Sequence, residues 1–237
     1  MKRLSLLTAL VLSLFATLSA QTAAKLTYTE ASQLTLVGKL MPGTPNPYHR
    51  IDTTAFTGFT PSENFQVRMS AGIAVAFKTN SPRIAVRATF GQVSTPDNAT
   101  AFTARGFDLY CRPTSRSQWC WAGSGVIGKS GELTLVNHMT TTAKEFLLYL
   151  PLFSEVKSVQ VGVNTGSTMQ PLAQPLRHRI AIFGSSFTHG SSTGRAGMTY
   201  PAQFARLTGL QLLSLGCSGN CKLQPYFAKA LAAAPDI

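Results

Sequence analysis

The chain has 237 residues, 44% of them hydrophobic, and a formal net charge of +12 at pH 7. A positive charge of this size suggests an acidic partner such as nucleic acid, but the basic residues are scattered singly, mostly at alternating strand positions that would face water: Arg68, Lys78, Arg83, Arg87, Arg105, Arg112 and Arg116. We therefore expect a solvated basic face and no nucleic-acid binding, with attraction to an anionic polysaccharide or cell-surface polymer as the alternative.

The N-terminus has the pattern of a signal peptide. Lys2 and Arg3 precede an apolar run over 4–18, and Ala20 follows it closely. The run is too short to favour a membrane span, although an uncleaved anchor is the alternative. We predict a signal peptide over 1–20, cleavage after Ala20 or Ala24, export to the periplasm or the cell exterior, and no stable membrane span after cleavage.

Residues 25–166 carry short runs of alternating hydrophobic residues separated by Gly, Pro, Asn and Ser, which is the pattern of an antiparallel β domain. The runs 73–77 and 84–88 flank a turn and predict a hairpin with one buried face. Further strands are expected at 35–40, 102–112, 119–122, 132–136, 145–150 and 158–163, and no helix of useful length. Seven or more strands predict a β-sandwich, jelly-roll-like, as an accessory domain over 25–166.

Four cysteines in an exported chain permit disulfides. A turn centred on 115–116 would place Cys111 directly opposite Cys120 across a hairpin, where neighbours can meet disulfide geometry. Cys217 and Cys221 could form a bridge that stiffens their loop, or they could remain two buried thiols. No metal site is expected, because this spacing needs a second ligand pair and the sequence has none nearby.

Trp119, Trp121 and Tyr110 are candidates for a glycan platform, because exposed aromatic side chains of a β domain can stack on sugar rings. The two tryptophans lie two residues apart and therefore on one face of the same predicted strand. A large aromatic pair on one face is more often part of the core, and we favour that role.

Residues 167–178 contain Gly, Ser, Thr and Pro without apolar periodicity and predict a linker. The apolar run 180–183 then predicts a strand buried on both faces. Gly184 allows a sharp turn that a side chain could obstruct, and Ser186 would lie at the carboxyl end of the strand.

A second strand of the same sheet is predicted at 210–215. A helix that begins near Pro201 and ends at Gly209 leads into it, which completes a β-α-β unit. Such a unit places Ser186 and Gly219 at the same edge of two parallel strands, the edge where open α/β sheets bind ligands.

Several segments resemble the SGNH (GDSL-type) hydrolases. Gly184-Ser185-Ser186-Phe187 is similar to their first block, and 215–220 is similar to their second. The segment 195–200 resembles the first helix entry of one branch, which carries a β-sandwich in front of a flavodoxin-like hydrolase domain. Three further segments resemble the accessory domain of that branch: 77–81, 106–110 and 150–152.

The resemblance implies that Ser186 is the nucleophile and that the backbone N–H groups of Ser186 and Gly219 form the oxyanion hole, with His189 and Asn220 as possible pocket residues. Ser192, in a Gly-x-Ser-x-Gly match, ranks below Ser186 because no strand directly precedes it. The family's third-block Asn and its late Asp-x-x-His do not appear in this sequence.

Acyl transfer by serine requires a nearby base. His189 follows Ser186 closely, but a loop neighbour seldom points its ring back along the line of attack. His178 would lie at the opposite end of the strand, and His49 and His138 fall in the β domain. The sequence therefore identifies no convincing base.

These observations predict an exported serine esterase that removes acyl groups such as acetyl from carbohydrate, a substrate class that the resemblance supplies. An acyl hydrolase of lipids or small esters is one alternative, and a carbohydrate-binding or surface protein with an inert hydrolase remnant is another. No cofactor is implied, and the oligomeric state stays open. Because 179–237 supplies only two strands and one further helix within 222–234, we expect the N-terminal part of a hydrolase domain and an incomplete, inactive fragment.

We predict that Cys111 and Cys120 are joined in the exported protein, which would stabilise it by about 2–3 kcal/mol through closure of a short loop. Mass spectrometry of unreduced peptides should detect the bridge. Alkylation of both thiols in unfolded, unreduced protein would contradict it.

Overall fold

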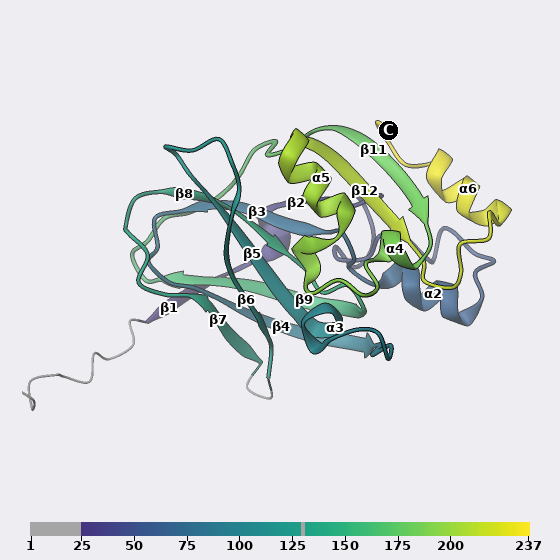
Figure 1. The fold of residues 1–237 in the computed structure, drawn as a ribbon, viewed down its shortest axis with the longest axis horizontal. Coiled ribbons are helices and arrows are strands. Elements are labelled where there is room, and N and C mark those ends of the chain that lie inside the picture. Colours follow the sequence, from purple (N-terminus) through teal and green to yellow (C-terminus); the bar gives the residue numbers. More distant parts are fainter. Residues whose placement is uncertain (1–24, 129–130) are drawn as a thin grey trace, which may run out of the picture.

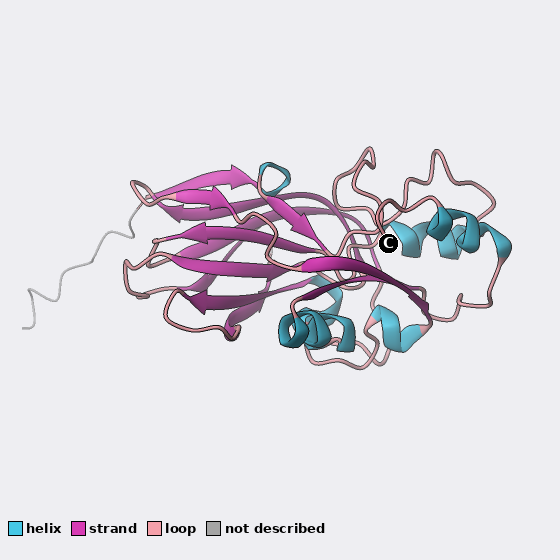
Figure 2. Cartoon of the chain, turned by 90° about the horizontal axis from the view of Figure 1, so that it is seen from above, coloured by secondary structure: helices cyan, strands magenta, loops and turns pink. Residues whose placement is uncertain are grey.

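The computed structural model describes residues 25–128 and 131–237, so the predicted signal peptide over 1–20 lies outside the described residues. A β part, residues 26–171, is followed by an α/β part, residues 177–232 (Figure 1). The strands of the β part occupy one side of the molecule, and most of the helices gather at the other end (Figure 2).

The β part consists of two antiparallel sheets that share one core. The first sheet contains, in order, β1 (Leu26–Glu30), β9 (Ser154–Asn164), β4 (Ile84–Val93) and β7 (Glu132–Val136). The second contains β10 (Met169–Pro171), β3 (Ala74–Thr79), β8 (Lys144–Tyr149), β5 (Gly106–Pro113) and β6 (Cys120–Val126), and β2 (Thr35–Val37) also pairs with β3. Alternate side chains of these strands fill the space between the sheets, among them Val75, Phe77, Val86, Leu109 and Val161.

The predicted hairpin of 73–77 and 84–88 is wrong, although both strands exist. β3 and β4 belong to different sheets, so the turn between them crosses from one layer to the other. Both strands still point alternate apolar residues into the common core, and alternation alone does not distinguish a pairing turn from a crossing turn. β3 is also covered on its second face, where Ala74 and Ala76 belong to one hydrophobic cluster with Ala202 and Ala205 of α5 (Tyr200–Thr208).

Two helices interrupt the β part where no helix was expected. α2 (Pro61–Arg68) lies in the segment 38–73 between β2 and β3, and its capping box pairs the Thr60 hydroxyl with the Glu63 N–H and the Glu63 carboxylate with the Thr60 N–H. The signal was present in the sequence as Thr-Pro-Ser-Glu, with proline at a first-turn position. α3 (Ala101–Arg105), which follows a Thr100 cap, replaces the beginning of the strand expected at 102–112. A short 3₁₀ turn, η1 (Ala31–Gln33), precedes β2.

The α/β part has the predicted β-α-β order. It contains β11 (Arg177–Gly184), α4 (Ser186–His189), η2 (Ala196–Met198), α5, β12 (Leu210–Gly216) and α6 (Pro225–Ala232). β11 and β12 are parallel, with Gly184 opposite Gly216 at their carboxyl ends. The predicted linker over 167–178 is shorter than expected, because β10 pairs with β3 and β11 already begins at Arg177.

β11 is not the fully buried strand that its apolar run predicted. Ile180 is 39% exposed, whereas the central residues of β12 are buried. β12 lies between β11 and the segment 38–73, whose Leu40, Ile51 and Val67 form one core with Leu213, Leu215 and Phe227. Apolar composition thus identified the strand but not how much of it is covered.

Asp108, at the centre of the segment 106–110, joins the two parts. Its buried carboxylate accepts hydrogen bonds from the N–H of Gly197 at 2.9 Å and from the indole of Trp121 at 3.1 Å, and it pairs with Arg195 at 3.1 Å.

The core role predicted for both tryptophans is wrong for Trp121, which is 55% exposed. Trp119 is partly buried and packs against the core cluster that includes Ala202 and Ala205 of α5.

Candidate active site

The Ser186 loop fits tightly against the ends of the two parallel strands. A Cβ atom at Gly184 would approach Thr188 Oγ1 to 1.9 Å, and one at Gly216 would approach the His189 backbone nitrogen to 2.0 Å. Side chains at these two positions would push α4 away from the sheet. Glycine at both therefore lets Ser186 begin a helical turn directly at the strand end.

The Gly219 loop leaves the sheet beside the Ser186 loop. Gly184 is paired with Gly216, and the Cys217 N–H donates to the Gly184 carbonyl at 2.9 Å, so the two loops start from adjacent backbone. Within residues 25–128 and 131–237, the N–H groups of Ser186 and Gly219 donate to no protein acceptor. Gly219 has a φ of 74°, which a larger residue would adopt only with strain. The structure thus brings together the two loops that the sequence singled out.

His189 is turned away from the nucleophile. Its ring is fully buried, its Nε2 lies 2.9 Å from the Leu152 carbonyl, and its Nδ1 accepts from the Ser218 N–H at 3.4 Å. The ring also stacks on Phe153, with centroids 4.4 Å apart. Burial first, and then the charge of Arg50, lowers the pKa of His189 to about 3, so the ring is neutral at physiological pH. His189 is a structural link between the two parts and does not line an open pocket.

The other histidines also lie away from Ser186. His178 is at the opposite end of β11 and exposed, His138 is exposed in a loop, and His49 pairs with Glu155 at 3.1 Å. In the described part of the chain, the Ser186 hydroxyl has no hydrogen-bonding partner. The described residues therefore contain a candidate nucleophile and candidate oxyanion donors, with no histidine in contact with them.

Arg50 fixes the end of β12, from which the Gly219 loop starts. It is fully buried and donates to four backbone carbonyls, those of Gln66, Met69, Ser214 and Gly216, over 2.5–3.1 Å. Two of these carbonyls belong to the segment 38–73 and two to β12. Burial lowers the pKa of Arg50, and none of the ion pairs among the described residues provides it with a carboxylate.

α2 contacts the Gly219 loop through side-chain hydrogen bonds. The Gln66 side chain donates to the Ser218 carbonyl at 2.8 Å, and the Asn220 amide donates to the Ser62 hydroxyl at 3.1 Å. Glu63 accepts from Gln224 and from the Tyr226 hydroxyl at the start of α6. Asn220 therefore ties its loop to α2 in this structure, and its role as a pocket residue stays a prediction.

Sequence reasoning missed Arg50 and Gln66. Both lie more than 140 positions before their partners in β12 and its loop, and neither belongs to a recognisable motif. The capping box of α2 was a readable sign of a helix, but nothing in it indicated where the helix would pack.

The remaining candidates take other positions. Cys111 and Cys120 face each other in the β5–β6 register, as predicted, and both are free thiols here, so the bridge itself stays a prediction. Cys217 is a buried free thiol, and burial raises its pKa to about 11. Ser192 is exposed and receives a hydrogen bond from Asn98 at 3.2 Å.

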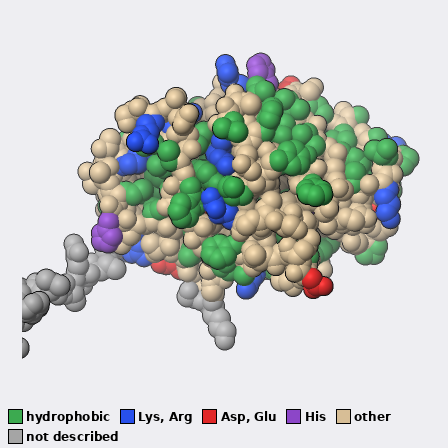
Figure 3. All heavy atoms as spheres, in the orientation of Figure 1, with side chains coloured by type: hydrophobic (Ala, Val, Ile, Leu, Met, Phe, Trp, Pro, Cys, Tyr) green, Lys and Arg blue, Asp and Glu red, His purple; other side chains and the backbone are tan. Residues whose placement is uncertain are grey.

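Three general features of the described residues bear on binding. No group of three or more His, Cys, Asp or Glu side chains within 25–128 and 131–237 is arranged to hold a metal ion. In the same residues no helix combines the length and apolarity needed to cross a membrane. The basic side chains are dispersed over the face seen in Figure 3 and do not form one continuous patch on it.

Comparison with known families matches both parts of the chain. Residues 26–169 match the GxDLY family, described as the N-terminus of SGNH hydrolase-type esterases, and the name-giving motif is Gly106-Phe107-Asp108-Leu109-Tyr110 here. Residues 177–235 match the GDSL-like lipase/acylhydrolase family. A search of curated proteins finds no match.

Two of the solved structures that are similar to the chain are informative about it. A protein described as a GDSL-like lipase from Bacteroides ovatus is 36% identical, with a TM-score of 0.83 over 89% of this chain. A salicylyl-acyltransferase from a tetracycline biosynthetic pathway is 23% identical, with a TM-score of 0.62 over 92% of this chain, and shares the fold. The chain spans only 62% of the first protein and 58% of the second.

We predict that Arg50→Met lowers the free energy of unfolding by about 3 kcal/mol or more, because several buried carbonyls would lose their donor. Urea unfolding of this variant should be compared with that of Arg105→Met, an exposed arginine whose loss should cost at most about 0.5 kcal/mol. Equal effects of the two substitutions would contradict the role of Arg50.

His189 should make stability depend on pH. Below about pH 6.5 the unfolded chain binds a proton at His189 that the folded chain does not bind until about pH 3, so stability is lost as the pH falls through this window. The expected slope reaches about 1.4 kcal/mol per pH unit. Urea unfolding at pH 7 and pH 5 should show a smaller loss for His189→Gln than for the unsubstituted chain. The same loss in both proteins would be evidence against a neutral, buried ring.

Proposed function

The chain belongs to the SGNH esterases that carry an N-terminal GxDLY domain, and from this premise we propose that it provides the nucleophile and oxyanion hole of a carboxylic ester hydrolase. Ser186 is the proposed nucleophile, and the N–H groups of Ser186 and Gly219 are the proposed oxyanion donors. The pairing of Gly184 with Gly216 carries this proposal, because it starts both loops from adjacent backbone with their amides unpaired among the described residues.

The proposed reaction has two steps. Ser186 Oγ attacks the ester carbonyl carbon, its proton passes to a base, and the developing oxyanion is stabilised by the two N–H groups. The alcohol leaves with a proton, and water then cleaves the acyl-serine to release the carboxylic acid and restore the hydroxyl. We assign the base to no residue of this chain, because none of its histidines reaches Ser186.

We propose acylated carbohydrate, with acetyl as the acyl group, as the substrate, and the periplasm or the cell exterior as the location. The GxDLY family match supports the esterase class, and the N-terminal signal pattern supports export. The β part would serve as a β-sandwich accessory domain over 25–166, and residues 179–237 would open a flavodoxin-like hydrolase domain. The alternative is a carbohydrate-binding or surface protein whose hydrolase part is inert.

We predict that the 237-residue chain is acetylated at Ser186 by 4-nitrophenyl acetate but turns over more slowly than about 1 per second, the lower range of ordinary enzymes. An activated ester can acylate a weakly nucleophilic serine held beside oxyanion donors, whereas efficient turnover requires the base. Peptide mapping should locate the acetyl group, and the release of 4-nitrophenol gives the rate.

Two variants serve as controls. Ser186→Ala should abolish the adduct, and Ser192→Ala, at an exposed serine of the same segment, should leave it unchanged. An adduct on another residue would overturn the assignment of the nucleophile. Ser186-dependent turnover above about 1 per second would show that a base lies within this chain.

A further inference from the structure

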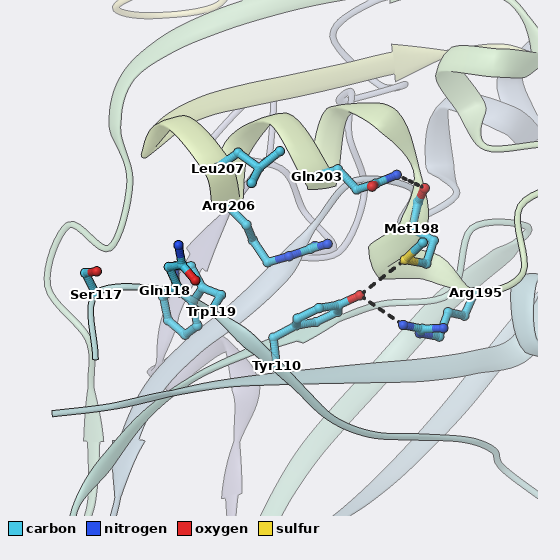
Figure 4. A pocket seen from close by; sticks show the side chains of 9 residues that line it. All are labelled: Tyr110, Ser117, Gln118, Trp119, Arg195, Met198, Gln203, Arg206 and Leu207. Carbon is cyan, nitrogen blue, oxygen red and sulfur yellow. Dashed lines mark hydrogen bonds between the residues drawn. The ribbon is translucent and has the colours of Figure 1, made fainter. Parts of the chain in front are cut away.

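A pocket of about 610 Å³ lies at the junction of the two parts, outside the Ser186 loop (Figure 4). Its floor is Tyr110 of β5, one wall is the β5–β6 loop with Trp119, and the opposite wall is α5. The volume falls within the range of about 300–1,000 Å³ that is usual for small-molecule sites. The pocket thus exists only because α5 packs against the β part.

The pocket is positively charged. Arg195 and Arg206 both line it, and none of its lining residues is acidic, while the buried carboxylate of Asp108 behind the lining interacts with both guanidinium groups. Arg195 already forms an ion pair with Asp108, in which Nε lies 3.1 Å from Oδ2. Arg206 is not among the ion pairs of residues 25–128 and 131–237, and its Nη1 is buried without a hydrogen-bonding partner there. Arg206 is half-buried and lines the pocket, so the guanidinium nitrogens other than the buried Nη1 are the ones that can pair with an external anion.

Arg206 is held in place by stacking. Its guanidinium carbon lies 3.7 Å from the centroid of Tyr110 and 5.3 Å from that of Tyr149. Figure 4 shows the guanidinium extended over the Tyr110 ring, between Trp119 and Met198. A planar guanidinium fixed in this way can recognise a carboxylate through two parallel N–H donors.

The other lining groups suit a sugar. Gln118, Gln203 and Ser117 provide uncharged donors and acceptors for hydroxyl groups, and Trp119 and Leu207 provide apolar surface for the C–H groups of a ring. Leu207 is 85% exposed at the edge of the pocket. A phosphate site would be expected to have several free cations or a cluster of free backbone N–H groups.

We propose that this pocket binds a carboxylate-bearing sugar, such as a uronic acid unit of an acidic polysaccharide, with its carboxylate on Arg206. The site differs from the proposed oxyanion site and requires no hydrolysis, so it stands independently of the esterase proposal. The net charge of +12 would concentrate such a polymer around the protein.

Calorimetric titration of the Ser186→Ala chain with trigalacturonic acid tests the proposal. Binding should be at least about tenfold tighter than that of the uncharged galactotriose, and it should weaken as salt is added. Arg206→Gln should weaken binding about tenfold or more, whereas Arg177→Gln, which removes an exposed charge from β11, should change it less than about twofold.

Leu207→Glu places a carboxylate at the exposed edge without altering the core and should also weaken binding about tenfold, which keeps the test valid if Arg206→Gln does not fold. The proposal is overturned if trigalacturonic acid does not bind at millimolar concentration, or if a folded Arg206→Gln or Leu207→Glu chain binds it unchanged. Equal binding of inorganic phosphate would overturn the sugar assignment and leave a general anion site.

Discussion

The buried guanidinium of Arg50 is the constraint on which the rest of the structure depends. A charged group without a carboxylate partner is costly to remove from water unless all of its donors are satisfied. Arg50 makes four such hydrogen bonds, at least one from each of its three nitrogens, only while carbonyls of the segment 38–73 and of β12 surround it together. The carbonyl of Gly216, the last residue of β12, is one of them, so the start of the Gly219 loop is fixed by a residue from the β part of the sequence.

Two hydrophobic clusters also join the β part to the α/β part. One joins Ala74 and Ala76 of β3 to Ala202 and Ala205 of α5, and the other joins the segment 38–73 to β12 and α6. His189, Gln66 and Asp108 add polar links across the junction. The β part is therefore more than an attached binding module, because it completes the interior of the α/β part and supports both loops of the candidate site.

Much of the fold could be predicted from local sequence. Alternation located the strands from β2 to β9 but missed β1 and β10, the Gly-Ser-Ser motif at the end of an apolar run located the Ser186 loop, and the cysteine spacing gave the pairing of Cys111 with Cys120. What could not be predicted depends on distant partners. The crossing between β3 and β4, the burial of His189 and the position of Arg50 follow from packing between segments far apart in the chain. The predicted core position of Trp121 is wrong for the same reason. Its indole donates a hydrogen bond to Asp108, which also pairs with residues of the α/β part.

The central claim is that the β part and the α/β part form one cooperative unit. Differential scanning calorimetry of the chain tests it most directly, because the ratio of van't Hoff to calorimetric enthalpy counts cooperative units. The account predicts one transition with a ratio of about 1. Two separate transitions, with the α/β part melting while the β part stays folded, would contradict it.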